Sequence, residues 1–257
     1  MVKAGCEIRI GTSGWYYDHW RGRFYPEELP KSDWLAHYSK EFDTVEINNT
    51  FYHLPQEQTL RKWCKLAPGR FLFAVKASRY ITHVKKLRDT KEELKRFFER
   101  IELLKNHLGP VLYQLPPTLG KNLSRLGTFL KLLPERHKAV FEFRNETWYT
   151  DDTFKLLDDL GAGFCIHDLG GEVTPKIITG GVIYIRFHGT SGRYAGNYTK
   201  PMLTRWAKWI EQNKENVRAV YAYFNNDVSG HAVANARTFR SLVSTRASEY
   251  QSPGNAI

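Results

Sequence analysis

Strand-like and helix-like segments alternate along the whole chain, and this alternation limits the folds open to it more than any other feature. Eight short segments are rich in β-branched or aromatic residues, as strands usually are. These predicted strands are Glu7–Gly11, Thr44–Asn48, Phe71–Lys76, Val111–Leu115, Ala139–Phe143, Gly163–His167, Val182–Phe187 and Ala219–Phe224. Amphipathic patterns between them predict helices. These are Glu57–Leu66, Lys91–His107, Leu123–Leu133, Thr153–Leu160, Pro201–Asn213 and Ala232–Leu242.

Helices that alternate with strands favour a parallel sheet. We expect a closed parallel (β/α)8 barrel of the TIM type, because 257 residues are a typical length for one such barrel. An open doubly wound sheet is the alternative. The sequence has no G-x-G-x-x-G after the first strand and no G-x-x-x-x-G-K, which weakens that alternative without eliminating it. The link between the sixth and seventh strands is short and contains Pro175, Gly180 and Gly181, so its helix is expected to be short or absent.

We expect a single barrel domain over residues 1–246, followed by a flexible tail over residues 247–257 that contains Ser, Pro, Gly and Asn. The three cysteines are scattered and form no C-x-x-C pair, which argues against a disulfide framework, an iron–sulfur cluster or a zinc ribbon. The sequence contains no signal-peptide pattern and no apolar stretch of membrane-spanning length. A cytoplasmic protein with no membrane partner and no obligate protein partner is therefore expected.

The formal net charge of +11 indicates which partners the chain attracts. A positive field of this size draws polyanions over a long range. The expected partner is a phosphate-bearing small molecule or a nucleic acid, and weak, salt-sensitive binding to nucleic acid follows from the charge. The alternative interpretation is that the charge only keeps the protein soluble.

The order of polar and apolar residues within the strands predicts which side chains enter the barrel, because side chains alternate between the two faces of a strand. In the seventh strand, Ile183, Ile185 and Phe187 share the face that suits the helix layer. Tyr184, Arg186 and His188 share the other face. In the other strands the same alternation predicts that further side chains point inward. They are Glu46, Asn48, Lys76, Gln114, Glu142, Arg144, Tyr221, Tyr223 and Asn225. In the sixth strand, either His167 or Asp168 can point inward, but not both.

The inward polar residues fall late in their strands, at the end where barrel enzymes hold their sites. Charges in a lumen are costly unless they are paired or used. We therefore consider both a ligand site and a buried ion network, for instance one joining Glu142 to Arg186. The candidate catalytic residues are Glu46, Glu142, His188 and Asp168. The candidate substrate-binding residues are Trp15, Asn48, Tyr52, Lys76, Gln114, Arg144, Arg186, Gly189, Tyr223 and Asn225.

Two loops add to the predicted site. The aromatic segment from Gly11 to Pro26 could stack on a base or sugar, or it could form a small satellite core, and both roles are compatible. Tyr52, after the second strand, could bring a hydroxyl to the mouth. The segment His188–Tyr198 contains three glycines and two hydroxyl residues, so its backbone could approach an anion. A flexible surface loop is the alternative for this segment.

The mouth has enough oxygen and nitrogen donors for a divalent metal. No H-E-x-x-H or comparable spacing supports a metal, and Lys76, Arg144 and Arg186 would repel a cation. A divalent metal is therefore a disfavoured alternative, and the sequence predicts no other cofactor.

Residues 7 to 243 contain nine short motifs that together resemble the YecE-like family of TIM-barrel proteins, a domain family of unknown function. The motifs are GTSGW at Gly11–Trp15, FYP at Phe24–Pro26, VEINNTFY at Val45–Tyr52, FAVKAS at Phe73–Ser78, QLPP at Gln114–Pro117, EFRNETW at Glu142–Trp148, IHD at Ile166–Asp168, IRFHG at Ile185–Gly189 and YFNND at Tyr223–Asp227. Departures are mild, such as Asn49 where the family often has Ser. The resemblance implies a closed barrel with a polar mouth, and it implies no reaction.

The favoured functional hypothesis is an enzyme that acts on a phosphate-bearing substrate. Lys76, Arg144 and Arg186 would bind the anion, Glu46 or Glu142 would be the general base, and His188 would act as acid or base near neutral pH. Phosphodiester cleavage by a nuclease-like hydrolase is the specific expectation. A sugar-phosphate isomerase or lyase needs the same residue types and stays open. The alternative of another class is a non-catalytic nucleic-acid-binding protein.

Overall fold

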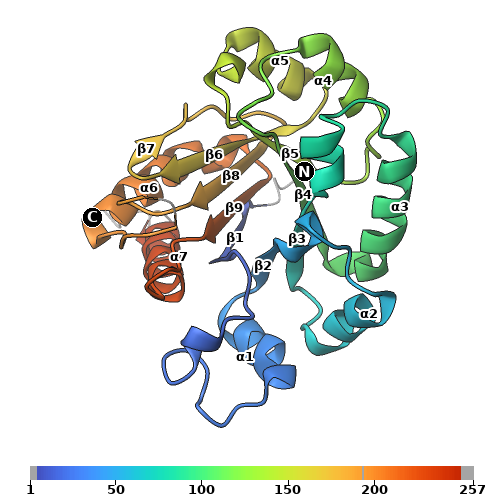
Figure 1. Cartoon of the computed structure of the whole chain (residues 1–257). Coiled ribbons are helices and arrows are strands. Elements are labelled where there is room, and N and C mark those ends of the chain that lie inside the picture. The colour runs from blue at the N-terminus through green and yellow to red at the C-terminus, as the bar shows by residue number, and fades with distance from the viewer. Residues whose placement is uncertain (1–4, 193, 250–257) are drawn as a thin grey trace, which may run out of the picture.

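The computed structural model describes residues 5–192 and 194–249, and it shows eight parallel strands in a nearly closed barrel with helices around it (Figure 1). The parallel strands are β1 (Glu7–Thr12), β2 (Thr44–Ile47), β3 (Leu72–Lys76), β4 (Leu108–Gln114), β5 (Ala139–Glu142), β6 (Gly163–Leu169), β8 (Val182–Phe187) and β9 (Ala219–Phe224). They follow the order β1-β9-β8-β6-β5-β4-β3-β2 around the barrel. The predicted TIM-type fold is confirmed.

Helices cover the outer face of the barrel. They are α1 (Trp34–Glu41), α2 (Glu57–Leu66), α3 (Lys91–Ile101), α4 (Leu123–Leu130), α5 (Asp151–Asp159), α6 (Lys200–Asn213) and α7 (Ala232–Glu249). Between β6 and β8 the chain forms only the short strand β7 (Glu172–Val173), antiparallel to β6, so the helix predicted to be short or absent is absent from this described segment. None of the described helices is long and apolar enough to cross a membrane.

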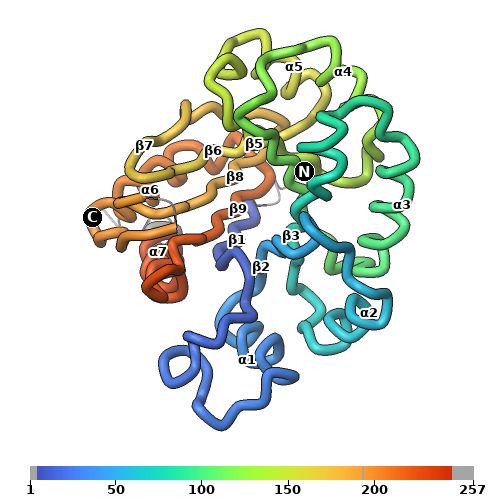
Figure 2. The backbone as a smooth tube through the Cα atoms, in the orientation of Figure 1, coloured from blue at the N-terminus to red at the C-terminus, as the bar shows by residue number. Residues whose placement is uncertain are grey.

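The ends of the described chain differ from the expectation in one respect. Helix α7 continues to Glu249, so the first three residues of the expected tail, 247–249, belong to its last turn. Residues 250–257, the rest of that tail, lie outside the described residues. Strand β1, the first of the chain, lies beside α7, the last helix (Figure 2).

The predicted alternation of faces is confirmed in β8. Ile183, Ile185 and Phe187 pack into the core between the strands and the helices. Tyr184 turns into the lumen, where its ring lies 5.3 Å from that of Tyr223. The lower lumen is filled mainly by apolar and tyrosine side chains, so it is a packed core and not a channel. The charged cluster around Arg186 lies above this layer, at the C-terminal end of the barrel, while Arg9 pairs with Glu7 and Asp43 at the opposite end.

The seam between β1 and β2 closes the barrel through few contacts. Among the described residues, its only strand-type link is the bridge between Ser13 and Glu46. The Tyr38 hydroxyl, from α1, fills the seam below this bridge: it accepts a hydrogen bond from the Thr12 amide at 3.0 Å and donates one to the Thr44 carbonyl at 3.1 Å. A short helix that was not among the predicted ones therefore supplies a group that holds the barrel closed.

Removing this hydroxyl tests its role in closure. We expect Tyr38→Phe to lower the free energy of unfolding by roughly 1–3 kcal/mol, because a buried amide and a buried carbonyl lose their partner. Urea denaturation measures the change. Tyr52→Phe is the control, since Tyr52 is 71% exposed and its replacement should stay within about 0.5 kcal/mol of the parent. Equal effects of the two substitutions would contradict a closing role for Tyr38.

Candidate active site at the C-terminal end of the barrel

A buried arginine on β8 joins two carboxylates from other strands at the upper end of the lumen. Arg186 Nη1 donates a hydrogen bond to Glu142 Oε2 on β5 at 2.6 Å, and its Nη2 donates to Glu46 Oε1 on β2 at 2.7 Å. The Arg186 side chain is 2% exposed and both carboxylates are fully buried. The structure thus realises the alternative in which Arg186 is the buried partner of Glu142, and it adds Glu46 to the pair.

Glu46 is held by a full set of donors. In addition to Arg186, its carboxylate accepts hydrogen bonds from Ser13 Oγ at 2.8 Å, from the Tyr184 hydroxyl at 2.6 Å and from the Asn48 amide at 3.2 Å. These partners come from β1, β8 and the end of β2. These hydrogen bonds occupy the buried carboxylate and hold it in place as the anchor of Arg186.

Glu142 lies between two guanidinium groups. Arg186 binds one of its oxygens, and Arg144 Nη2 forms an ion pair with the other. Burial by itself raises the pKa of the Glu142 carboxyl, but the charges of Arg144 and Arg186 outweigh burial and hold that pKa well below its ordinary value of 4.5. Glu142 is therefore an anion at neutral pH and a weak base.

His188 accepts a hydrogen bond from Arg144. The Nη2 to Nε2 distance is 2.8 Å, and a guanidinium group can only donate, so Nε2 must carry a lone pair. Burial and the Arg186 charge hold the pKa of His188 well below its ordinary value of 6.5, so the ring is neutral and its proton sits on Nδ1. Asn225 Nδ2 lies 3.2 Å from this Nδ1, so for Nδ1–H to donate, the Asn225 amide must be turned to present its oxygen. His188 is not poised near neutral pH as the sequence suggested.

His167, and not Asp168, is the residue of β6 that enters the lumen. Its ring lies 6.0 Å from the ring of His188, and burial lowers the pKa of His167 to about 4. Its Nδ1 is buried and has no hydrogen-bond partner among the described residues, and the same is true of Arg144 Nε. Buried polar atoms without partners are rare in folded proteins, and they point to a group that the site is built to bind.

Lys76 ends β3 at the same level. Its Nζ lies 4.1 Å from the centre of the Phe51 ring and makes no hydrogen bond or ion pair with another described residue. Burial and the nearby Arg186 lower the pKa of Lys76 to about 8. Gln114, at the end of β4, is half-buried and is paired in register with Glu142. The mouth therefore brings together the predicted residues Glu46, Asn48, Lys76, Gln114, Glu142, Arg144, Arg186, His188 and Asn225.

Two predicted residues lie in the barrel structure away from the mouth. Asp168 points to the opposite face of β6, where it accepts hydrogen bonds from the Gly171 amide at 3.2 Å and from the Tyr198 hydroxyl. Tyr223 points inward but lies deeper, with its hydroxyl 2.8 Å from Thr44 Oγ1. Neither side chain is grouped with the charged cluster.

The two predicted loops are used mainly for packing. Trp15 packs edge-on against Trp63 at 5.0 Å within the main core, while Tyr52 is exposed on the rim. Gly189 has a φ of +116°, and a Cβ there would lie 2.0 Å from the Ala195 carbonyl oxygen, so only glycine fits. Its amide already donates to the Tyr198 hydroxyl at 3.1 Å. The Gly189 amide is therefore not free for an anion.

Some site residues were missed because their roles depend on contacts between distant segments. Phe51 carries the Lys76 ammonium on its ring, and Ser13 bonds Glu46. Asp227 accepts hydrogen bonds from His19 at 2.7 Å and from the Trp20 indole at 2.9 Å, which fastens the loop after β1 to the loop after β9. No spacing in the sequence signals these pairs.

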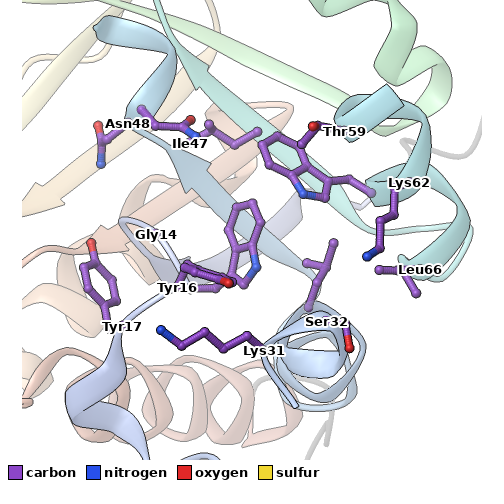
Figure 3. A pocket seen from close by; sticks show the side chains of 14 residues that line it. Gly14, Tyr16, Tyr17, Lys31, Ser32, Ile47, Asn48, Thr59, Lys62 and Leu66 are labelled. Atoms are coloured by element: carbon purple, nitrogen blue, oxygen red, sulfur yellow. The ribbon is translucent and has the colours of Figure 1, made fainter. Parts of the chain in front are cut away.

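A pocket of about 550 Å³ adjoins the mouth (Figure 3). It lies between the loop after β1, the start of α1 and helix α2, and its apolar wall includes Trp15 and Trp63. Lys31 and Lys62 line it from α1's side and from α2. Asn48 lines the pocket and also contacts Glu46 and Arg186, so it links the pocket to the charged cluster. The volume is in the range of small-molecule sites.

The described part of the chain places no group of three or more His, Cys, Asp and Glu side chains where they could hold a metal ion. The divalent metal considered from the sequence thus gains no support from the arrangement of these donors.

Replacing Arg186 tests the buried network. We expect Arg186→Met to lower the free energy of unfolding by about 3–5 kcal/mol, because the buried Glu46 loses its counter-charge and the buried Glu142 keeps only Arg144. Arg61→Met is the control: Arg61 and its partner Glu57 are both exposed, so that pair should contribute no more than about 1 kcal/mol. Denaturant unfolding of both variants measures the difference. A loss in Arg186→Met no larger than in Arg61→Met would contradict the structural role.

The low pKa of His167 predicts a stability that depends on pH. The folded pKa of about 4 lies below the ordinary 6.5, so the unfolded chain binds more protons between these values. Stability is then fully present above pH 6.5 and is lost as the pH falls towards 4, by on the order of 3 kcal/mol from this group. We expect His167→Gln to reduce the fall in the urea midpoint over this range, whereas the exposed His53→Gln should not. If the urea midpoint fell equally with pH in the parent and in both variants, His167 would not be the source of the pH dependence.

Comparisons with known proteins identify the family. The family model described as a protein of unknown function, DUF72, matches residues 9–256. The protein YunF of Bacillus subtilis is 28% identical over 272 residues, which cover 92% of this chain and 94% of that protein. YecE of Escherichia coli is 30% identical over 116 residues, which cover 45% of this chain and 43% of YecE.

Solved structures agree. The crystal structure of a DUF72 family protein from Thermotoga maritima has a TM-score of 0.84 and 28% identity to this chain, and it covers 93% of this chain and 99% of its own. A DUF72 family protein from Enterococcus faecalis, 20% identical with a TM-score of 0.78 over 92% of this chain and 95% of its own, shows the same fold. The YecE-like resemblance is thereby confirmed, and this chain belongs to the DUF72 family of proteins of unknown function.

Proposed function

We propose that the protein is an enzyme that binds a small phosphate-bearing substrate at the C-terminal mouth of the barrel. The observation that carries this proposal is an excess of cationic donors without acceptors. The cluster contains three cations, Lys76, Arg144 and Arg186, and two carboxylates, Glu46 and Glu142, and Arg186 already bonds both carboxylates. Arg144 Nε and Lys76 Nζ have no hydrogen-bond acceptor in the described parts of the chain.

Arg144 is the main phosphate ligand in this proposal. Its side chain is 15% exposed, whereas Arg186 is closed off, so it is the guanidinium that a ligand can reach. Its Nη2 already bonds Glu142 and His188, whereas its Nε and Nη1 bond no described residue and remain for a phosphate. Lys76, two strands away, adds positive charge. The adjoining pocket would take the rest of the substrate, with Asn48 at the boundary between them.

Among phosphate-bearing substrates, the site supports carbon chemistry on a sugar phosphate, as in a lyase or isomerase, better than phosphodiester cleavage. Phosphodiester cleavage by the expected route needs Glu46 or Glu142 as a base that activates a nucleophile. Glu46 is fully buried and its carboxylate is occupied by four donor residues, so it is not placed to contact a substrate. The pKa of Glu142 is well below its ordinary value, so Glu142 is a poor base. The amine of Lys76, with a pKa lowered to about 8, is better matched to proton transfer near neutral pH.

Titration with inorganic phosphate, followed by calorimetry, tests the site. We expect the parent protein to bind phosphate and Arg144→Lys to bind it about ten- to a hundredfold more weakly, because a lysine keeps the charge but loses the Nε and Nη1 donors of the guanidinium group. Arg61→Lys, on the exposed side of α2, is the matched control and should bind as the parent does. Thermal unfolding of each variant shows whether the fold is kept.

Two results would count against this function. The absence of phosphate binding by the folded parent would remove its basis. If labelled DNA bound with a steep salt dependence, and Arg144→Lys left that binding unchanged, the charge of +11 would act over the surface, as in a non-catalytic nucleic-acid-binding protein.

A further inference from the structure

Lys76 occupies an unusual position for a lysine in a charged cluster. The carboxylates nearest to it in the cluster, Glu46 and Glu142, are both bonded to Arg186. Instead of a carboxylate, Lys76 Nζ contacts the face of the Phe51 ring, 4.1 Å from its centre. A cation–π contact holds the group in place and takes up none of the nitrogen's hydrogen-bonding capacity. The nitrogen is therefore positioned by packing and is left chemically available.

The surroundings of Lys76 disfavour its charged form. Burial is the main cause and the charge of Arg186 acts in the same direction, while Glu142 and Glu46 oppose it, and the pKa falls from 10.5 to about 8. About one in ten of these side chains is then neutral at pH 7, against fewer than one in a thousand for an ordinary lysine. A neutral amine has the lone pair that a nucleophile requires.

One more titratable group faces Lys76, from the segment that follows β3. His83 packs edge-on against the Phe51 ring at 4.9 Å, and its Nδ1 lies 2.9 Å from Thr82 Oγ1. Burial and the Lys76 charge lower the pKa of His83 to about 4. His83 is therefore neutral at working pH and adds no further positive charge beside the amine.

We propose that Lys76 is a nucleophilic amine that forms an imine with a carbonyl carbon of the phosphate-bearing substrate. The proposal rests on the phosphate-binding function above, since Arg144 would hold the phosphate while the carbonyl group meets Lys76 across the mouth. It assigns the substrate to the class of phosphorylated aldehydes and ketones. A buried lysine at the end of a barrel strand is well suited to this chemistry, because the neutral amine needs a desolvated setting.

The reaction balances without any further reagent. The Nζ lone pair attacks the carbonyl carbon, the C–N bond forms, and the C=O π electrons move to oxygen, which takes one proton from the nitrogen. The oxygen then takes the second nitrogen proton, the C–O bond breaks, and the nitrogen lone pair completes the C=N bond. One water leaves, carrying both amine protons. Protonation of this imine makes it an electron sink that weakens the neighbouring C–C or C–H bond of the substrate.

Reductive trapping on the whole protein tests the imine. Glycolaldehyde phosphate is the probe, sodium cyanoborohydride reduces any protonated imine to a stable secondary amine, and peptide mapping by mass spectrometry locates the label. We expect rapid single labelling at Lys76, with a rate that rises as the pH passes through about 8. Lys76→Met and Lys76→Arg should both lose the rapid label. The exposed Lys155→Met should label as the parent does.

The outcomes separate this inference from the function on which it rests. Labels spread over surface lysines, with the same rate in Lys76→Arg as in the parent, would overturn the imine; if the parent still binds inorganic phosphate, the phosphate site stands. Rapid labelling of Lys76 by glycolaldehyde and by its phosphate alike, with no competition from inorganic phosphate, would keep the amine and overturn the phosphate site. If circular dichroism shows that Lys76→Met does not fold, the test depends on two other results: the position of the label in the parent protein, and the labelling rate of Lys76→Arg.

Discussion

The guanidinium group of Arg186 is the feature on which the rest of the mouth depends. It extends from β8 across the lumen and binds carboxylates that belong to β2 and β5, so one planar group links three separated strands. Charges this deeply buried are tolerated only when their partners are complete. Ser13 and Tyr184 add to the shell of Glu46, and Arg144 gives Glu142 a second counter-charge. These contacts fix the upper end of the barrel, where β1 and β2 are joined by few strand contacts.

The same pairing determines which groups remain available for a ligand. Because Arg186 uses both carboxylates, the lysine that ends β3 has a ring for a neighbour instead of a counter-ion. Arg144 pairs with Glu142 and His188 through Nη2, which leaves its Nε without a partner in the described structure. The way the structural ion pairs are satisfied thus decides which groups stay available, and Arg144 takes part in both roles, since it pairs with Glu142 and keeps an Nε that bonds no described residue.

The sequence predicts the direction of a side chain wherever the alternation of faces along a strand decides it. The alternation of Tyr184, Arg186 and His188 with apolar residues predicts their direction, because side chains on a strand alternate strictly. The same rule leaves His167 and Asp168 undecided, since each can be the last inward residue, and only the hydrogen bonds of Asp168 on the outer face settle it. The Tyr38 hydroxyl in the seam and the ring beneath Lys76 depend on contacts between segments, for which no local pattern exists.

The two neutral histidines complete the electrostatics of the mouth. With His167 and His188 uncharged, three cations face two carboxylates and the cluster carries a net charge of +1. Protonation of both buried rings would raise it to +3, and repulsion between buried charges is only weakly screened. Burial favours the neutral rings, and the neutral His188 ring in turn gives Arg144 an acceptor. The low pKa of the histidines and the orientation of the arginine are therefore one property of the site, and a change that charges His188 must also displace Arg144.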